Sequence, residues 1–250
     1  MENMSCLNLK GVSKSFGGLN AIEAVDLEMM VGERRAVIGP NGAGKTTLFN
    51  LISGELLPDD GSISLFDTNV TRLPVYKRIA LGLSRTFQVT NLFPALTVLE
   101  NLLLAAQGTD SSRFVMYRPR SSYRRFYDLS EKFMLEFGLQ DERHSLIRNL
   151  SHGEQRQVEV CLALIGQPRL LLLDEPTAGL SPAETQSFTA TLNKIDPGIT
   201  VLLIEHDMDV AFELADSISV LNLGQLVVSG TSDEIKNSKT VQEIYFGTDE

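Results

Sequence analysis

The chain has 250 residues, 43% of them hydrophobic, and a formal net charge of −10 at pH 7. This length and composition fit one large domain, or two small ones, with an ordinary core that needs no metal or disulfide to hold it. The acidic balance argues against general binding to nucleic acid, and the two cysteines are too few for a disulfide framework, which indicates a reducing compartment.

Neither a secretory signal nor a membrane span is expected. The opening stretch MENMSCLNLKG has no basic region followed by an apolar run. The longest apolar candidate, VCLALIGQPRLLLLD, is broken by Gln167, Pro168 and Arg169 and falls short of the roughly 18 apolar residues of a span. We therefore expect any membrane role to depend on a partner protein.

The first third of the chain alternates short β-rich runs with turns. A glycine-rich loop leads into a helix expected from about Lys45 to Ser53. The strands expected in this part are residues 7–16, 22–29, 34–39 and 61–66.

The middle of the chain changes to a helical pattern, expected from Thr97 to about Arg148. Apolar residues there recur at the spacing of one helix face, as in Leu99, Leu102, Leu103 and Ala106. Residues 109–122 between the helical runs are expected to form a loop. The middle of the chain is therefore predicted to be a helical insert.

The last third returns to an α/β pattern. A well-buried helix is expected over residues 153–166. The runs at 170–174 and 199–205 are almost continuously apolar, as is typical of parallel strands that are covered on both faces. The whole pattern predicts an α/β core interrupted by the helical insert.

The glycine-rich loop fits the phosphate-loop pattern G-x-x-x-x-G-K-[ST] at every position, between a strand and a helix. Its residues are Gly39, Pro40, Asn41, Gly42, Ala43, Gly44, Lys45 and Thr46. Glycines let backbone amides curl around phosphate oxygens, and the helix start adds partial positive charge. Lys45 would reach the β- and γ-phosphates of a nucleotide, and the Thr46 hydroxyl would bind Mg²⁺.

Polar residues follow the two apolar strands of the last third. Asp174 and Glu175 end the run LLLLDE, and His206 follows the strand at 199–205. Because ligands of open α/β sheets bind at the carboxyl ends of strands, we expect Asp174 to hold Mg²⁺, and Glu175 to orient or deprotonate an attacking water. The alternatives are that Glu175 caps the helix near Pro182 and that His206 is an ordinary polar residue rather than a γ-phosphate contact.

Taken in order, the motifs resemble those of the ATP-binding-cassette (ABC) ATPases over essentially the whole chain. The motifs are Gly39–Thr46, Gln88 after Arg85-Thr-Phe, LSHGEQ at 150–155, LLLDE at 171–175, and His206. More narrowly, the chain resembles ATPase subunits of branched-chain amino-acid uptake transporters. That narrower resemblance is carried by SRTFQ at 84–88, Leu92-Phe93, TVLEN at 97–101, PTAGL at 176–180, IEHDM at 204–208 and IYFG at 244–247.

The resemblance implies a fold and a domain organisation. The fold would be α/β: a P-loop NTPase core with a mainly parallel sheet, an N-terminal antiparallel β subdomain and an inserted α-helical subdomain. Residues 1–250 would form a single nucleotide-binding domain. Residues 89–165 would be the helical insert, including the signature motif, and residues 230–250 would be a helical tail.

The resemblance also implies residue roles. Phe16, where the wider family often has Tyr, would stack on adenine. The nucleotide contacts would be Phe16, Gly39, Pro40, Asn41, Gly42, Ala43, Gly44, Lys45, Thr46, Thr47, Ser151, Gly153 and Glu154. The catalytic residues would be Glu175, His206 and Gln88. The metal ligands would be Thr46, Gln88 and Asp174, and the cofactors ATP and Mg²⁺.

The motif LSHGEQ also resembles a hydrolase triad, because Ser151, His152 and Glu154 lie within four positions. We interpret it instead as an anion-binding helix start that completes the ATP site of an opposing subunit. The family often has Gly at His152 and Gln at Glu154. It also often has Asp at Ser181, at the end of the 176–181 loop, which would cross to the partner ATPase.

The implied partners are a second ABC ATPase subunit, identical or different, and transmembrane permeases docked near Val89–Asn101. A periplasmic or lipid-anchored binding protein would act indirectly, and no nucleic acid is expected. The chain would lie at the cytoplasmic face of the inner membrane. The basic cluster Arg113, Arg118, Arg120, Arg124 and Arg125 would face lipid headgroups or the permease, or be a solvated loop.

These features imply an ATPase that energises an importer of branched-chain or related amino acids through dimer closure. The rival transporters move urea, short amides or lipopolysaccharide. A non-transport ABC protein acting on ribosomes or DNA is the alternative from another class. It is disfavoured because this chain has one cassette, a short insert and an acidic balance.

Overall fold

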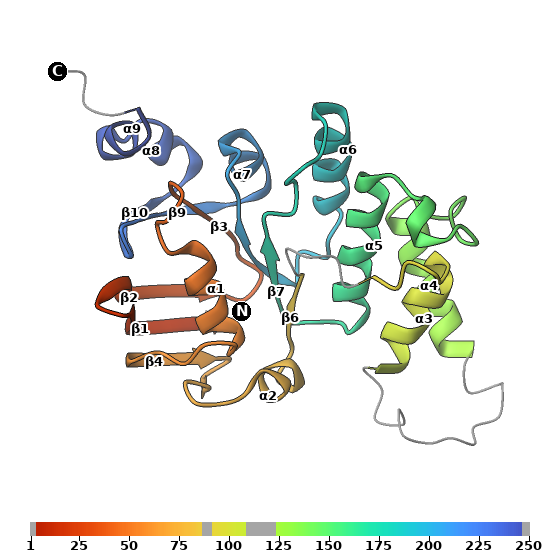
Figure 1. Cartoon of the computed structure of the whole chain (residues 1–250), viewed down its shortest axis with the longest axis horizontal. Helices are drawn as coiled ribbons and strands as arrows, with labels where there is room; N and C mark the ends of the chain where they lie inside the picture. The colour runs from red at the N-terminus through yellow and green to blue at the C-terminus, as the bar shows by residue number, and fades with distance from the viewer. Residues whose placement is uncertain (1–3, 87–91, 109–123, 247–250) are drawn as a thin grey trace. The chain divides into compact units, whose positions relative to one another are not determined.

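The structure is a computed structural model that describes residues 4–86, 92–108 and 124–246 (Figure 1). The chain divides into two compact units. The first unit comprises Met1–Arg85, Arg169–Pro176 and Asp196–Glu250, and the second comprises Thr86–Pro168 and Thr177–Ile195.

The first unit contains a four-stranded antiparallel sheet. Its strand order is β2 (Leu19–Met30), β1 (Ser5–Phe16), β4 (Asp60–Leu65) and β5 (Thr68–Asn69). In β4 the buried side chains Ile63 and Leu65 alternate with less buried ones, as expected for a sheet with one face on the core. The predicted N-terminal antiparallel subdomain is confirmed.

The first unit also contains a six-stranded sheet. Its strand order is β10 (Gln225–Gly230), β9 (Ser217–Asn222), β3 (Arg34–Ile38), β8 (Thr200–Ile204), β7 (Leu170–Asp174) and β6 (Leu83–Arg85). All neighbours pair in parallel except β10 with β9. Every residue of β7 and β8 is buried, which explains their nearly continuous apolar sequences. The predicted mainly parallel sheet is confirmed.

Helix α1 (Lys45–Ser53) ties the two sheets together. Its apolar residues share one core cluster with residues of both sheets. These helix residues are Leu48, Phe49, Leu51 and Ile52. Because α1 starts directly after the glycine-rich loop, this packing fixes the position of the loop. The unit's remaining helices are α2 (Val75–Ala80), α7 (Met208–Leu214), α8 (Ser232–Lys236) and α9 (Lys239–Phe246).

The second unit is helical. It contains α3 (Val98–Gly108), α4 (Arg124–Glu136), the short 3₁₀ helix η2 (Ile147–Asn149), α5 (His152–Ile165) and α6 (Pro182–Leu192). Helices α3, α4 and α5 pack on one another, and α6 packs on α5 (Figure 1). Among the described residues, no helix has both the length and the apolar character needed to cross a membrane.

The predicted extent of the helical pattern, to about Arg148, is wrong. Helix α4 ends at Glu136, and Gly138 adopts a left-handed conformation with φ +69° that helices do not continue through. Turns follow, tied back by an ion pair between Arg143 and Glu131. The expected loop at 109–122 lies outside the described residues.

Candidate active site

The loop between β3 and α1 has a shape that glycine alone permits at two positions. A Cβ atom on Gly39 would lie 2.1 Å from the carbonyl oxygen of Leu221. Gly44 has φ +104°, and a Cβ there would lie 2.3 Å from the carbonyl oxygen of Ala21. Gly44 is also the N-cap of α1 and has no side chain that could accept from the first-turn amides. Those amides can therefore serve an anion, as the sequence predicts.

Lys45, the first residue of α1, is folded back onto this loop. The side chain is buried, and its Nζ donates to the carbonyl oxygens of Gly39 at 2.6 Å and Pro40 at 3.1 Å. Burial lowers the pKa of Lys45, while the nearby carboxylates of Glu175 and Asp174 oppose this shift. The result is a buried ammonium group inside a loop shaped to hold phosphate.

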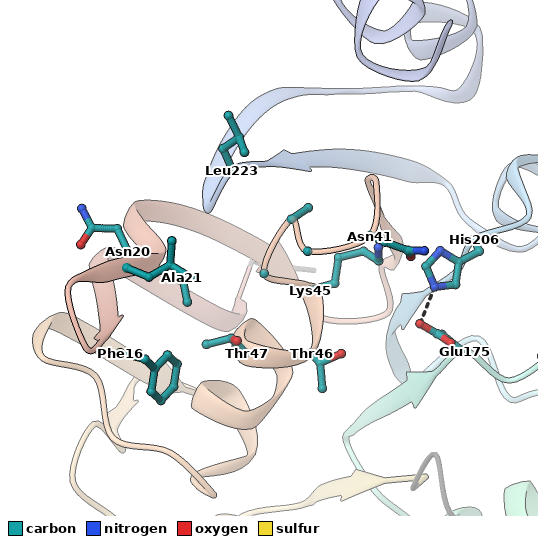
Figure 2. Close-up of a pocket in the computed structure, with 14 residues that line it drawn as sticks. Phe16, Asn20, Ala21, Asn41, Lys45, Thr46, Thr47, Glu175, His206 and Leu223 are labelled. Atoms are coloured by element: carbon teal, nitrogen blue, oxygen red, sulfur yellow. Dashed lines mark ion pairs between the residues drawn. The ribbon is translucent and has the colours of Figure 1, made fainter. Parts of the chain in front are cut away.

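The loop borders a cavity of about 590 Å³. Figure 2 shows Phe16 on one side of the phosphate loop, Glu175 and His206 on the other, and Lys45 and Thr46 between them. Phe16 is 46% exposed, so part of its aromatic surface is available to a ligand. The cavity is lined by Phe16, Leu19, Asn20, Ala21, Asn41, Gly42, Ala43, Gly44, Lys45, Thr46, Thr47, Glu175, His206 and Leu223.

Glu175 and His206 form a pair at the carboxyl edge of the parallel sheet. Glu175 Oε1 lies 2.6 Å from His206 Nε2, and the imidazole is 45% exposed (Figure 2). Glu175 has φ +47°, an unusual conformation for a residue with a side chain. The alternative that Glu175 caps the helix near Pro182 is wrong, because Ser181 is the N-cap of α6.

Asp174, the last residue of β7, is 1% exposed and paired with Arg85 of β6. Burial raises the pKa of the Asp174 carboxyl, and the hydrogen bond and charge of Arg85 oppose that shift. In the sequence, Arg85 stands only as part of the SRTFQ motif, which does not predict this contact. The sequence signal for it is a basic residue three positions before Gln88.

The oxygen atoms at this edge suit a magnesium ion that arrives with a nucleotide. Among the residues in the described ranges, no group of three or more His, Cys, Asp and Glu side chains could hold a metal. The hydroxyl of Thr46 and the carboxylate of Asp174 are oxygen donors of the kind that Mg²⁺ prefers, completed by phosphates and water. Gln88, the third expected ligand, lies outside the described residues.

In the second unit, Ser151 caps helix α5. Its Oγ donates to Glu154 Oε2 at 2.9 Å, and its backbone amide donates to the same oxygen at 2.8 Å. The Glu154 amide donates back to Ser151 Oγ, which completes a capping box. The motif is thus a helix start, and the Ser151 hydroxyl is hydrogen-bonded within it.

A second carboxylate lies at the same helix start. The Glu184 carboxylate, which completes the capping box of α6 with Ser181, lies beside Gly153: a Cβ atom on Gly153 would be 3.5 Å from Glu184 Oε1. The pKa of Glu184 is lowered, chiefly by the hydroxyl and the amide of Ser181, with a further contribution from Gly153. The start of α5 therefore already holds an anionic group from its own unit.

The phosphate loop between β3 and α1, its buried lysine and the acids at the end of β7 define a P-loop nucleotide-binding protein. A family model described as ABC transporter matches residues 22–178. The chain belongs to the ABC transporter family, and it is an ATPase of that family.

Similar proteins align with almost the whole chain. The high-affinity branched-chain amino acid transport ATP-binding protein LivG of Escherichia coli (strain K12) is 37% identical over 96% of this chain and 97% of its own. BraF of Pseudomonas aeruginosa, with the same description, is 36% identical over the same shares. The lipopolysaccharide export system ATP-binding protein LptB of Escherichia coli (strain K12) is 31% identical over 98% of this chain and 99% of its own.

Solved structures agree on the fold. The ATP-binding cassette MJ1267 of an ABC transporter superposes with a TM-score of 0.85 at 27% identity, over 97% of this chain and 99% of that chain. The ADP conformation of the same cassette gives a TM-score of 0.82 at 28% identity, over 98% of this chain and all of that chain.

Proposed function

We propose that this chain energises the uptake of branched-chain or related amino acids by binding and hydrolysing ATP. The similarity to LivG and BraF, which extends over nearly the whole length of each chain, supports this solute class. The lower identity to LptB makes lipopolysaccharide export the weaker alternative. Urea or short amides remain the rival solutes, because an ATPase subunit does not contact the solute.

The order of groups along the cavity supports one orientation of ATP. Adenine stacks on the exposed face of Phe16, because an aromatic ring binds any base by its π-face. The phosphates lie over the loop amides, where Lys45 leaves the carbonyl oxygens of Gly39 and Pro40 to contact the β- and γ-phosphates. The terminal phosphate would then lie toward Glu175 and His206, which Figure 2 shows on the side of the loop opposite Phe16.

The observation that carries the hydrolytic mechanism is the Glu175–His206 pair beside the phosphate loop. Glu175 orients the attacking water and accepts its proton, and His206 contacts the γ-phosphate while fixing the Glu175 carboxylate. Thr46 and Asp174, with Gln88, would hold Mg²⁺, which neutralises phosphate charge when bound. In-line attack then needs positioning and charge stabilisation more than covalent chemistry.

We propose that Ser151, Gly153 and Glu154 act on the ATP of a second ABC ATPase subunit. The positive end of helix α5 supports this role, and the Ser151 hydroxyl and amide would leave Glu154 to contact the anion. ATP held between two subunits favours the closed dimer, and hydrolysis removes that preference. The loop at residues 176–181 would approach the partner, with Ser181 engaged in capping α6.

The remaining proposals concern organisation and partners. Residues 1–250 would act as one nucleotide-binding domain with a helical insert at 89–165 and a helical tail at 230–250. Permeases would contact the region Val89–Asn101, where Phe93 is exposed, and a solute-binding protein would act through them at the cytoplasmic face of the membrane. Residues 89–91 and most of the basic cluster lie outside the described residues.

The solute assignment is tested by uptake in cells that lack this chain. The cells are complemented with the wild-type chain or with Glu175→Gln, and uptake of labelled leucine and labelled urea is measured. We expect leucine uptake only with the wild-type chain. Restored urea uptake without leucine uptake would replace the amino-acid assignment by the urea alternative.

A further inference from the structure

Arg85 joins two parts of the candidate active site through one guanidinium group. Its side chain is 9% exposed, and its Nη2 donates to Asp174 Oδ2 at 2.7 Å. Its Nη1 donates to Asn50 Oδ1 at 2.7 Å and Ser53 Oγ at 3.2 Å, and it pairs with Glu55 Oε1 at 3.1 Å. One nitrogen therefore contacts the acid of β7, and the other contacts the C-terminal end of α1.

These two attachments define the geometry of the site. Helix α1 begins at the phosphate loop and ends at the residues that hold Nη1, while Asp174 ends the strand next to β6. The guanidinium plane is rigid, so its two nitrogens fix the carboxylate of Asp174 relative to α1. The guanidinium group of Arg85 also lies over the ring of Phe49 on α1, with 5.8 Å between its Cζ and the ring centroid.

The net charge of this cluster is compatible with a bound cation. Arg85 alone would repel a divalent ion beside Asp174. Its charge is shared between two carboxylates, however, since Glu55 contacts Nη1 and Asp174 contacts Nη2. The three groups together keep a net negative charge at the end of β7.

We propose that Arg85 is the positioning residue of the magnesium site: it holds the Asp174 carboxylate in the orientation that receives the ion. The inference rests on the proposed function, in which Asp174 is a magnesium ligand. Groups that hydrogen-bond a metal ligand fix its orientation and commonly change metal affinity by about 10- to 100-fold when removed. Arg85 contacts the Asp174 carboxylate through Nη2. Its contacts through Nη1 hold that carboxylate in a fixed position relative to α1.

The test measures the affinity of the full-length protein for Mn²⁺ in the presence of ADP, from the electron paramagnetic resonance signal of free Mn²⁺. ADP affinity in EDTA is measured separately. We expect Arg85→Met to weaken Mn²⁺ binding about tenfold and to change ADP affinity in EDTA less than about twofold. Arg85→Lys, which keeps the charge but loses the two-sided contact, is expected to fall between Arg85→Met and the wild type.

A double-mutant cycle separates positioning from general damage. If Arg85 acts through Asp174, adding Arg85→Met to Asp174→Asn leaves Mn²⁺ affinity at the level of Asp174→Asn alone. Arg35→Met is the matched control, because Arg35 is similarly buried and paired with Glu33 at 2.6 Å. This control is expected to leave Mn²⁺ affinity unchanged.

Four results would decide against the inference or its basis. Unchanged Mn²⁺ affinity in Arg85→Met, or an equal loss of ADP binding in EDTA, would make Arg85 an ordinary structural ion pair. If Arg85→Met does not fold, wild-type affinity in Arg85→Lys overturns the inference. Unchanged affinity in Asp174→Asn would instead remove Asp174 from the metal site, which is a failure of the proposed function.

Discussion

The imidazole Nε2 of His206 lies 2.6 Å from Oε1 of Glu175, although the two residues are far apart in the sequence. Each follows a strand of the parallel sheet, β8 for His206 and β7 for Glu175. Because neighbouring parallel strands end at the same edge, the two side chains meet beside the phosphate loop. In the proposed mechanism, Glu175 would be the base and His206 would contact the terminal phosphate.

Removal of His206 should reduce hydrolysis more than binding. We expect His206→Ala to lower the rate of phosphate release by roughly 10²–10³-fold, the usual effect of removing one donor to developing charge. ATP affinity should stay close to that of the wild type. His144→Ala is the control, since His144 is an exposed histidine of the second unit. A phosphate-release rate equal to that of this control would exclude a role for His206 in hydrolysis.

Replacing glycine by alanine in the phosphate loop should destabilise the chain less at Gly42 than at Gly44. Gly42→Ala places its Cβ in open space and should cost about 1–2 kcal/mol, because φ is +79°. Gly44→Ala also drives its Cβ into the Ala21 carbonyl, 2.3 Å away, and should cost about 3 kcal/mol or more. Urea unfolding without nucleotide measures both costs. Equal costs would show that the close approach at Gly44 is unimportant.

The ring of Phe16 should contribute to ATP binding through stacking. Phe16→Ala should weaken the binding free energy by about 1–3 kcal/mol, whereas Phe16→Tyr, which keeps the ring, should bind like the wild type. Equilibrium titration with a fluorescent ATP analogue measures both variants. Wild-type affinity in Phe16→Ala would mean that adenine lies elsewhere in the cavity.

The cap of helix α6 should become less effective in acid. The pKa of Glu184 is lowered from 4.5 in the folded chain, chiefly by the hydrogen bond from the Ser181 side chain. A lowered folded-state pKa means that the stabilisation is fully present above the unfolded value of 4.5 and disappears as the pH falls through the folded value. The difference in unfolding free energy between the wild type and Glu184→Gln should therefore be constant near pH 7 and shrink below pH 4.5. A difference that does not depend on pH would refute the linkage.

Most of the fold and much of the candidate site could be predicted from local sequence patterns. The pattern of the phosphate loop predicts its own shape, and the apolar runs before Asp174 and before His206 predict strands whose ends share an edge. The end of α4 at Glu136 was missed because the apolar spacing continues beyond it, while Gly138 turns the chain.

Contacts between segments that are distant in the sequence could not be predicted from local patterns. The two-sided contact of Arg85 and the position of Glu184 beside Gly153 depend on tertiary packing that no short motif encodes. The role of Gln88 stays a prediction, because that residue lies outside the described part of the chain.

We propose that Glu175 acts on the water that attacks ATP. This proposal is tested most directly by comparing ATP binding and phosphate release in Glu175→Gln, which keeps the shape of the side chain but removes the base. We expect near wild-type ATP affinity, a loss of phosphate release of about 10²–10⁴-fold, and an ATP-bound dimer in size-exclusion chromatography. Near-normal phosphate release by this variant would exclude Glu175 as the catalytic base.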